Sequence, residues 1–243
     1  MPADYFDDRI ARSYDEDVAD MFDQGLLDAT VDALALLAAG GPALELGIGT
    51  GRVAVPLARQ GVSVHGIDLS EAMVRQLRSK PGSDAISVTL GDFATVRVGG
   101  TFRLAYLVFN TISNLTTQEE QVHCFLNVAD HLEEGGRFLV EVGVPELQRL
   151  PPGETFVPSE VSSRHVCIDE IDVATQSLRS HHYFVRDDAV EHHSIPFRYV
   201  WPSELDLMAR LAGMTLVDRW ADWDREPFTS VSRKHISVWR KGA

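Results

Sequence analysis

The feature that most constrains the fold of this chain is a run of three glycines, Gly47, Gly49 and Gly51. A short apolar run over residues 42–46 precedes them, and a helical pattern over residues 52–59 follows. Glycine adopts backbone conformations that other residues avoid, so such a turn brings free N–H groups at a helix start close to a ligand. The spacing predicts a ligand-binding turn between a strand and a helix, although the triplet alone also fits a tightly packed turn.

Strand and helix patterns alternate over the first 150 residues. Strands are expected at 42–46, 62–67, 85–90, 102–109 and 137–142. Helices are expected at 4–39, at 52–59, after Ser70 as a cap, and after Thr117 as a cap with Gly135 and Gly136 as its stop. This alternation predicts βαβ units and a doubly wound α/β fold with a parallel sheet.

Residues 151–200 interrupt this pattern, because they carry β-like runs and no clear helix. They predict an antiparallel β insert with a hairpin turn over residues 186–189. A helix from Pro202 to Ala212 and strands at 214–220 and 235–240 then complete the α/β pattern. We therefore expect one domain over 1–243, with a helical segment 1–40, a ligand-binding core 41–150, an insert 151–200 and a C-terminal part 201–243.

The charge of the chain argues against two classes of partner. The formal net charge is -14 and no basic run is present, so the surface would repel nucleic acid and anionic lipid. No apolar run reaches the roughly 18 residues that span a bilayer, and the first ten residues do not resemble a signal peptide. We expect a cytoplasmic protein that binds neither nucleic acid nor membrane.

Polar residues follow the next three strands of the predicted sheet. Asp68 ends the second strand, Asp92 and Phe93 end the third, and Asn110 ends the fourth beside the expected switch point. A carboxylate at the second strand can accept hydrogen bonds from ribose hydroxyls. An NAD-binding turn would need glycine at position 52, where this chain has Arg52.

In this order, the motifs around Glu45 to Gly51, Gly66 to Ser70, Gly91 to Phe93 and Phe109 to Ile112 resemble those of class I S-adenosylmethionine (SAM)-dependent methyltransferases. The resemblance implies a Rossmann-like sheet of seven strands with an antiparallel last strand. It also implies that Glu45 anchors the glycine loop and the methionine amino end, that Asp68 holds the ribose, and that Asp92 and Phe93 frame the adenine. The other cofactor residues that we expect are Tyr14, Arg52, Leu69, Met73, Gly91, Phe109 and Asn110.

The flanks are similar to a narrower group, the N-methyltransferases that act on amino sugars in macrolide pathways. The similarity rests on Tyr14 with Asp15 and on the antiparallel insert. In that group a tyrosine like Tyr14 approaches the cofactor near its sulfonium. Part of the group has histidine where this chain has Asn114, which weakens any transfer of the substrate.

An amine acceptor needs only to arrive deprotonated, whereas a hydroxyl acceptor gains from a general base. The catalytic candidates are Tyr14, Asn114, Glu141 and His181. Glu141 either points into the acceptor pocket or pairs with a nearby cation, and no metal site is expected. Other candidates lie on the insert, which we expect over the carboxyl ends of the strands: His182, His192 and His193 as bases, and Arg198, Tyr199 and Trp201 either as pocket lining or as packing.

With the hairpin turn centred on residues 187 and 188, His182 would face His193, and Tyr183 would face His192, across the insert.

Together, the motifs and the resemblance lead to the hypothesis of an enzyme that transfers a methyl group from SAM to a nitrogen or oxygen of a small molecule in secondary metabolism, acting as a homodimer. The alternatives are a protein with this fold that binds SAM without catalysis and an NAD-binding oxidoreductase.

Overall fold

The computed structural model describes residues 5–17, 23–186 and 189–242. Seven strands form one sheet in the order β10-β11-β5-β4-β1-β2-β3. The four pairings among β1 to β5 are parallel, while β11 runs antiparallel to both β5 and β10. The strands of this sheet are β1 Ala43–Leu46, β2 Val64–Asp68, β3 Ser87–Leu90, β4 Phe102–Leu107, β5 Leu132–Gly143, β10 Met214–Trp220 and β11 Lys234–Lys241. The predicted antiparallel last strand is confirmed.

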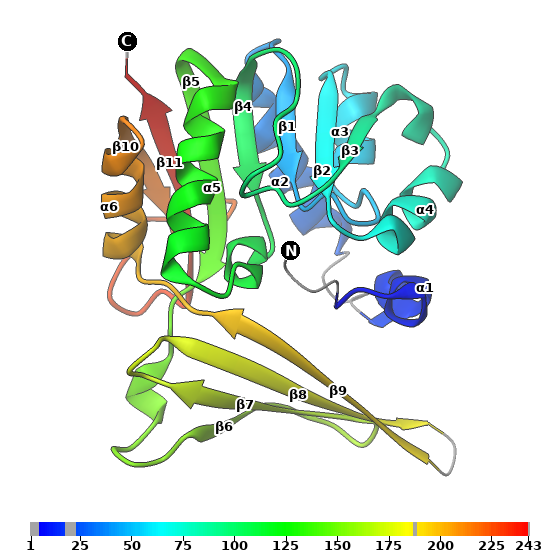
Figure 1. The fold of residues 1–243 in the computed structure, drawn as a ribbon, viewed down its shortest axis with the longest axis vertical. Coiled ribbons are helices and arrows are strands. Elements are labelled where there is room, and N and C mark those ends of the chain that lie inside the picture. The colour runs from blue at the N-terminus through cyan, green and yellow to red at the C-terminus, as the bar shows by residue number, and fades with distance from the viewer. Residues whose placement is uncertain (1–4, 18–22, 187–188, 243) are drawn as a thin grey trace.

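Helices cover both faces of this sheet, as a doubly wound fold requires (Figure 1). One apolar core lies between the sheet and helices α5 (Gln118–His131) and α6 (Pro202–Leu211). A second core lies between the other face and helices α2 (Gln24–Ala38), α3 (Ala54–Arg59) and α4 (Glu71–Ser79). Because β1 and β4 are buried on both faces, their sequences read as nearly continuous apolar runs.

Several helix boundaries follow their predicted caps. Ser70 accepts the Met73 N–H at the start of α4, and Thr117 forms a reciprocal capping box with Glu120 at the start of α5. The expected helix over residues 4–39 is instead α1 (Asp8–Asp17) and α2, which begins after the Asp23 cap. Residues 18–22 of that expected helix lie outside the described part of the chain.

The predicted stop of α5 at Gly135 and Gly136 is wrong. The helix ends at His131, and both glycines lie within β5. The pairing of β4 with β5 shifts its register there, from Phe102 opposite Leu132 to Leu104 opposite Arg137. Gly135 has a φ of 74°, a conformation that glycine supplies at such an irregularity without a steric penalty.

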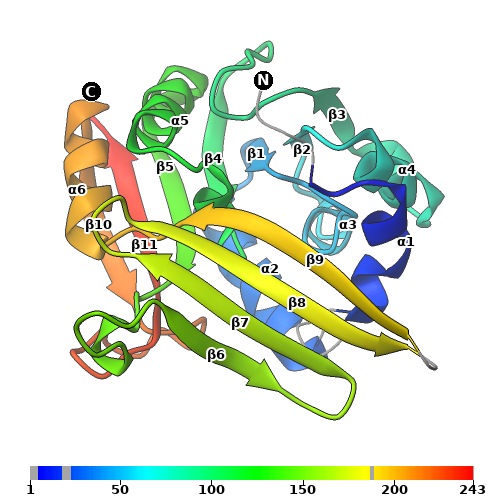
Figure 2. The same cartoon turned by 60° about the horizontal axis from the view of Figure 1, so that its bottom comes forward.

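The insert forms a second, antiparallel sheet in the order β6-β7-β8-β9. It lies beyond the edge at which the parallel strands end, as expected (Figures 1 and 2). The ladder of β8 with β9 places His182 opposite His193 and Tyr183 opposite His192, which confirms the predicted pairing, while the turn residues 187 and 188 lie outside the described residues. The strands of the insert are β6 Phe156–Val161, β7 His165–Asp172, β8 Ser177–Arg186 and β9 Ala189–Arg198.

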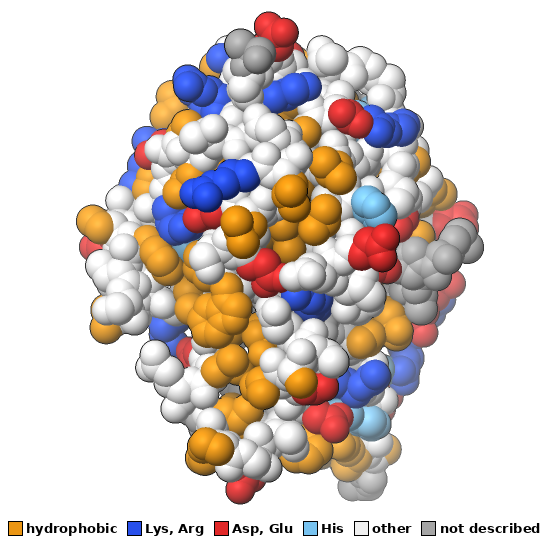
Figure 3. Space-filling view, turned by 60° about the vertical axis from the view of Figure 1, so that its left-hand side comes forward, with side chains coloured by type: hydrophobic (Ala, Val, Ile, Leu, Met, Phe, Trp, Pro, Cys, Tyr) orange, Lys and Arg blue, Asp and Glu red, His pale blue; other side chains and the backbone are white. Residues whose placement is uncertain are grey.

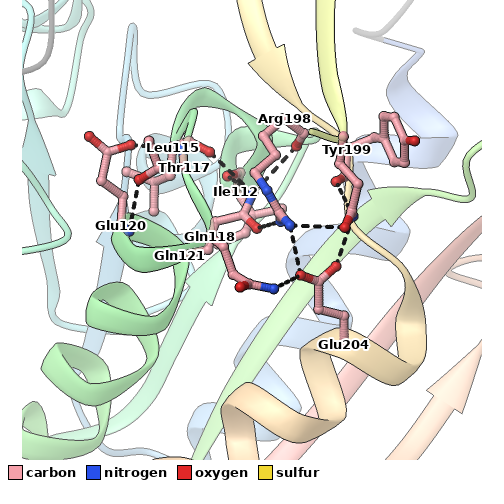
Figure 4. A network of polar contacts seen from close by, with 10 residues as sticks. Ile112, Leu115, Thr117, Gln118, Glu120, Gln121, Arg198, Tyr199 and Glu204 are labelled. Carbon is pink, nitrogen blue, oxygen red and sulfur yellow. Dashed lines mark hydrogen bonds and ion pairs between the residues drawn. The ribbon is translucent and has the colours of Figure 1, made fainter. Parts of the chain in front are cut away.

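A buried polar network joins the insert to helices α5 and α6 (Figure 4). Arg198, at the end of β9, donates to Gln121 of α5 at 2.6 Å and to Glu204 of α6 at 2.8 Å. Gln176, in the turn between β7 and β8, donates to the other oxygen of Glu204 at 2.9 Å and accepts from Arg198 at 3.1 Å. The side chain of Arg198 is 4% exposed. Of the two alternatives for Arg198, pocket lining or packing, the structure shows packing. Its contacts fix the position of the insert.

Figure 3 shows the side of the molecule that carries α6 and β10. There, basic side chains lie scattered among acidic and hydrophobic ones (Figure 3). Among the described helices, none combines the length and apolarity that crossing a bilayer requires.

We predict that Arg198→Met lowers the free energy of unfolding by about 3–5 kcal/mol, because it leaves the buried Glu204 carboxylate without its cation. The double variant Arg198→Met/Glu204→Leu should recover more than half of that loss. Urea unfolding measures both values. The control is Arg97→Met, which removes an ion pair with Asp130 whose side chains are 61% and 58% exposed and should cost less than about 1 kcal/mol. Equal losses in the two single variants would contradict this role of Arg198.

Candidate active site

The glycine loop connects β1 to α3 and takes a conformation that only glycine reaches easily. Gly47, Gly49 and Gly51 have φ values of 72°, 56° and 75°. A Cβ on Gly51 would lie 2.1 Å from Leu77 of α4, and one on Gly47 would lie 2.5 Å from Thr111. A Cβ on Gly49 would meet its nearest atom, on Met73, at 3.4 Å. Close packing thus explains Gly51 and Gly47, while the position of Gly49 is less crowded.

The carboxylate of Asp68, at the end of β2, holds two turns in place. One oxygen accepts the Gly49 N–H at 2.6 Å, and the other accepts the Ser70 N–H at 2.8 Å. Asp68 is 9% exposed. A carboxylate at the end of the second strand has the chemistry to accept hydrogen bonds from the ribose hydroxyls of a ligand.

Glu45 lies on β1 directly below the loop and is 3% exposed. Its Oε2 accepts from the Tyr106 hydroxyl at 3.0 Å, and no donor among the described residues reaches its Oε1. Burial raises the pKa of Glu45 to about 8, against the opposing effects of the Tyr106 hydrogen bond and the Arg52 cation. Burial therefore favours the protonated form of Glu45, and its Oε1 suits a cationic partner.

Helix α1 packs over the glycine loop and the start of α4. The Thr50 hydroxyl donates to Asp15 at 2.6 Å, and the Ser70 hydroxyl donates to the backbone oxygen of Phe6 at 2.6 Å. Tyr14 lies in the same layer, where burial raises its pKa and the charges of Arg52 and Asp68 both act on it. The structure thus places Tyr14 near the glycine loop and α4.

Further expected cofactor residues lie at the end of β3 and just after β2. Asp92 accepts the Ala94 N–H at 2.9 Å, and Phe93 is buried with its ring 3.8 Å from the position of a Cβ on Gly47. Leu69 is partly buried and Met73 is buried beside Gly49. Gly91 donates its N–H to the backbone of Asp68 at 2.8 Å. These contacts place the ends of β1, β2 and β3 around one region.

The turn after β4 is strained and is held by Glu141. Phe109 and Asn110 have φ values of 63° and 57°, which non-glycine residues rarely adopt. Glu141 of β5 accepts the Phe109 N–H at 3.0 Å and the Trp223 indole N–H at 3.1 Å, and Lys234 lies 3.7 Å from it. Of the two alternatives for Glu141, pairing with nearby donors is therefore the one observed. Arg52 stacks over the Phe109 ring at 4.8 Å.

A cleft of about 340 Å³ opens between this turn and the insert. Asn114 lies in its wall and donates to the Thr111 backbone oxygen at 3.2 Å, which leaves its side-chain oxygen as an acceptor. The other walls come from Tyr5, from the start of α5 and from β8 and β9: Thr116, Glu120, residues 177–179 and residues 196–197.

His181 does not line this cleft. Its ring nitrogens lie 3.3 Å from Glu170 and 3.4 Å from His192, both on the insert. His193 is the insert histidine that meets α1, with its Nδ1 at 2.7 Å from Arg9. Tyr199 is buried and Trp201 is 37% exposed, and neither lines the cleft. Among the described residues, no three His, Cys, Asp or Glu side chains converge as metal ligands would.

Sequence reasoning missed four contributors to this region: Arg9, Thr50, Arg179 and Trp223. Arg9, Thr50 and Trp223 contact residues far along the chain, and Arg179 lines the cleft. Local sequence patterns do not indicate such contacts. Thr50 is the partial exception, because it lies inside the glycine loop and the motif Tyr14 with Asp15 supplies its partner.

The site fits the cofactor that the sequence resemblance implies. The Oε1 of buried Glu45, which no donor among the described residues reaches, suits the ammonium of the methionine part, and the Asp68 carboxylate at the end of β2 suits ribose hydroxyls. Asp92 and Phe93 stand at the next strand end, where the adenine is expected.

Comparisons with known proteins agree with this geometry. A family profile described as a methyltransferase domain matches residues 43–136. The chain is 37% identical to the CcbJ methyltransferase from Streptomyces caelestis, with a TM-score of 0.85 and 98% of each chain covered. It is 28% identical to a cypemycin N-terminal methyltransferase from Streptomyces sp over 82% of each protein. The sugar N-methyltransferase KedS8 from Streptoalloteichus sp has the same fold, with a TM-score of 0.66 at 17% identity, 94% of this chain and 93% of that chain being covered.

We predict that Glu45 makes the protein less stable as the pH rises. The folded-state pKa of about 8 lies above the unfolded value of 4.5, so the stabilising effect of the bound proton is present below pH 4.5 and is lost as the pH rises through 8. Between pH 5 and pH 8 the wild type should lose on the order of 3 kcal/mol relative to Glu45→Gln. Urea unfolding at several pH values measures this difference. Glu119→Gln, at an exposed position, should track the wild type, and the same behaviour of Glu45→Gln would contradict the assignment.

Proposed function

Since the chain belongs to the SAM-dependent methyltransferases, we propose that it transfers a methyl group from SAM to a nitrogen atom of a small molecule. The observation that carries the proposal is the arrangement of Glu45, Gly49 and Asp68 at two adjacent strand ends, beside a small cleft that contains Asn114. When bound, SAM supplies a methyl group already activated on a sulfonium. The protein therefore contributes mainly by positioning, which reaches about 7–11 kcal/mol in favourable cases.

In this proposal, residues along the sheet edge contact different parts of SAM. Glu45 pairs with the methionine ammonium, and Asp68 accepts from the ribose while it holds Gly49 and Ser70. Asp92, Phe93, Leu69 and Met73 enclose the adenosine, with Gly91 at the base of that wall. Arg52, Phe109 and Asn110 shape the loop edges, and Tyr14 closes the site from α1.

The acceptor side lacks a general base. Among the described residues of the cleft wall, the one carboxylate is Glu120, which accepts the Thr117 N–H in the capping box of α5, and there is no histidine. This favours an amine, which needs only to arrive deprotonated, over a hydroxyl. The similarity to a cypemycin N-terminal methyltransferase and to the sugar N-methyltransferase KedS8 supports a nitrogen acceptor, in keeping with the expected role in secondary metabolism.

Asn114 orients that acceptor. Its amide nitrogen is engaged with Thr111, so its oxygen accepts an N–H of the substrate and directs the nitrogen lone pair. Glu141 acts as a positioning residue, because it fixes the strained turn of Phe109 and Asn110 rather than touching the substrate. We place His181 outside the acceptor contacts.

In this proposal the chain works as one domain over 1–243, because α1, the core and the insert all contribute residues to the cofactor site or the cleft. Homodimer formation stays a prediction. An oxidoreductase that uses NAD is disfavoured by Arg52, and a protein that binds SAM without catalysis is disfavoured by the cleft beside the cofactor residues.

We predict that Asp68→Ala weakens SAM binding by about 1.5–3 kcal/mol, because hydrogen bonds to a charged group are lost. Isothermal titration calorimetry measures the affinity, and circular dichroism checks the fold. The control is Asp130→Ala, which removes an exposed carboxylate on α5 and should leave the affinity unchanged. Equal affinities of Asp68→Ala and the wild type, or stabilisation by NAD instead of SAM, would contradict the proposal.

We predict that Asn114→Ala lowers kcat roughly fivefold, since one neutral hydrogen bond contributes about 1 kcal/mol to orienting the acceptor. Release of S-adenosylhomocysteine (SAH) with an amine acceptor measures the turnover. SAM affinity should not change, and Ser113→Ala at the neighbouring position should behave as the wild type. Loss of SAM affinity in Asn114→Ala would place this residue in the cofactor site instead.

A further inference from the structure

We propose that Arg179 binds a carboxylate of the acceptor, so that the substrate is an amino-acid-like amine with an apolar body. This inference rests on the proposed function, because it names the substrate class of the same site. Arg179 lies on β8 and lines the cleft that also contains Asn114.

The guanidinium of Arg179 is left uncompensated by the fold. The side chain is exposed, and within the described part of the chain it has no hydrogen bond or ion pair. Its neighbour across the ladder is Glu170 of β7, which is placed to neutralise it. Glu170 instead contacts His181, at 3.3 Å. In a chain with 36 acidic and 22 basic residues, a cation without a partner beside a cleft marks a position for an anion.

The other charged group of the cleft does not cancel this preference. Glu120 has its Oε2 3.0 Å from the Thr117 N–H, at the N-terminus of α5. The free N–H groups and dipole of a helix start stabilise a negative charge there, so that the Glu120 carboxylate is already compensated within the protein. Arg179 is thus the charge of the cleft that remains for a ligand.

The other residues that line the cleft indicate the chemistry of the rest of the ligand. Leu178 and Phe197 face each other across β8 and β9, and Pro196 stands opposite Arg179. These apolar walls, together with Tyr5, fit an aliphatic or aromatic group rather than a polar sugar. The volume of about 340 Å³ restricts the part held here to a small molecule.

A planar guanidinium accepts a carboxylate in a two-point contact, which fixes orientation as well as position. With the carboxylate at Arg179 and the apolar group against Pro196 and Tyr5, the amine is directed to the Asn114 side of the same cleft. That is the side on which the turn after β4 meets the cofactor residues. The geometry therefore orders the three parts of an amino acid along one cleft.

The test measures binding without turnover. The protein is saturated with SAH and titrated with N-acetyl-L-leucine or with N-acetyl-L-leucinamide, which differ only in the carboxylate. We expect the carboxylate probe to bind the wild type about tenfold more tightly than the amide. Arg179→Gln should abolish this difference, and Arg179→Lys should keep part of it. Arg210→Gln, at an exposed position on α6, should behave as the wild type.

The outcomes separate this inference from the proposed function. Equal binding of the two probes by the wild type, or an unchanged preference in Arg179→Gln, overturns the carboxylate assignment while normal SAH binding leaves the cofactor site intact. Failure of the wild type to bind SAH overturns the proposed function instead. Circular dichroism of Arg179→Gln confirms that its fold is retained, as expected for an exposed strand position.

Discussion

The Asp68 carboxylate is the contact on which the functional edge of this protein depends. It ties the glycine loop after β1 to the turn that begins α4, because its two oxygens accept N–H groups from Gly49 and Ser70. Helix α1 then docks on both turns, through Thr50 and the Ser70 hydroxyl. One buried carboxylate thus holds the floor of the candidate cofactor site and the two turns on which α1 packs. Because the loop is already held by the protein, less conformational freedom is lost when a ligand binds.

The insert supplies the opposite wall, and its position is fixed by polar contacts. Arg198 and Glu204 lie in a network between β9, α5 and α6, where a missing partner would leave a buried charge uncompensated. A second contact, between Arg9 and His193, joins the far end of the insert to α1. The insert therefore meets the core at both ends, and the acceptor cleft lies between them.

Local sequence signals predicted the elements well where caps and buried runs define them, as at Ser70, Thr117 and β4. They failed at Gly135 and Gly136, because a glycine pair that ends a helix looks the same as one that relieves an irregular strand pairing. The gathering of the candidate site residues at the strand ends was predictable, since parallel strands bring those ends together. The roles of Arg198, Arg179 and Glu141 were not, because each depends on contacts between distant segments. Alternation along β8 likewise gave no way to choose between its two faces for His181 and His182.

The central claim is that a neutral Glu45 beside the glycine loop receives the cationic end of SAM. The most direct measurement is calorimetric titration of SAM at pH 6.5 in two buffers with different ionisation enthalpies. With a ligand-free pKa of about 8, Glu45 holds its proton at this pH and should release about one proton per site when the ammonium binds. The account predicts this release in the wild type and its loss in Glu45→Gln. Binding with no dependence on the buffer would contradict it.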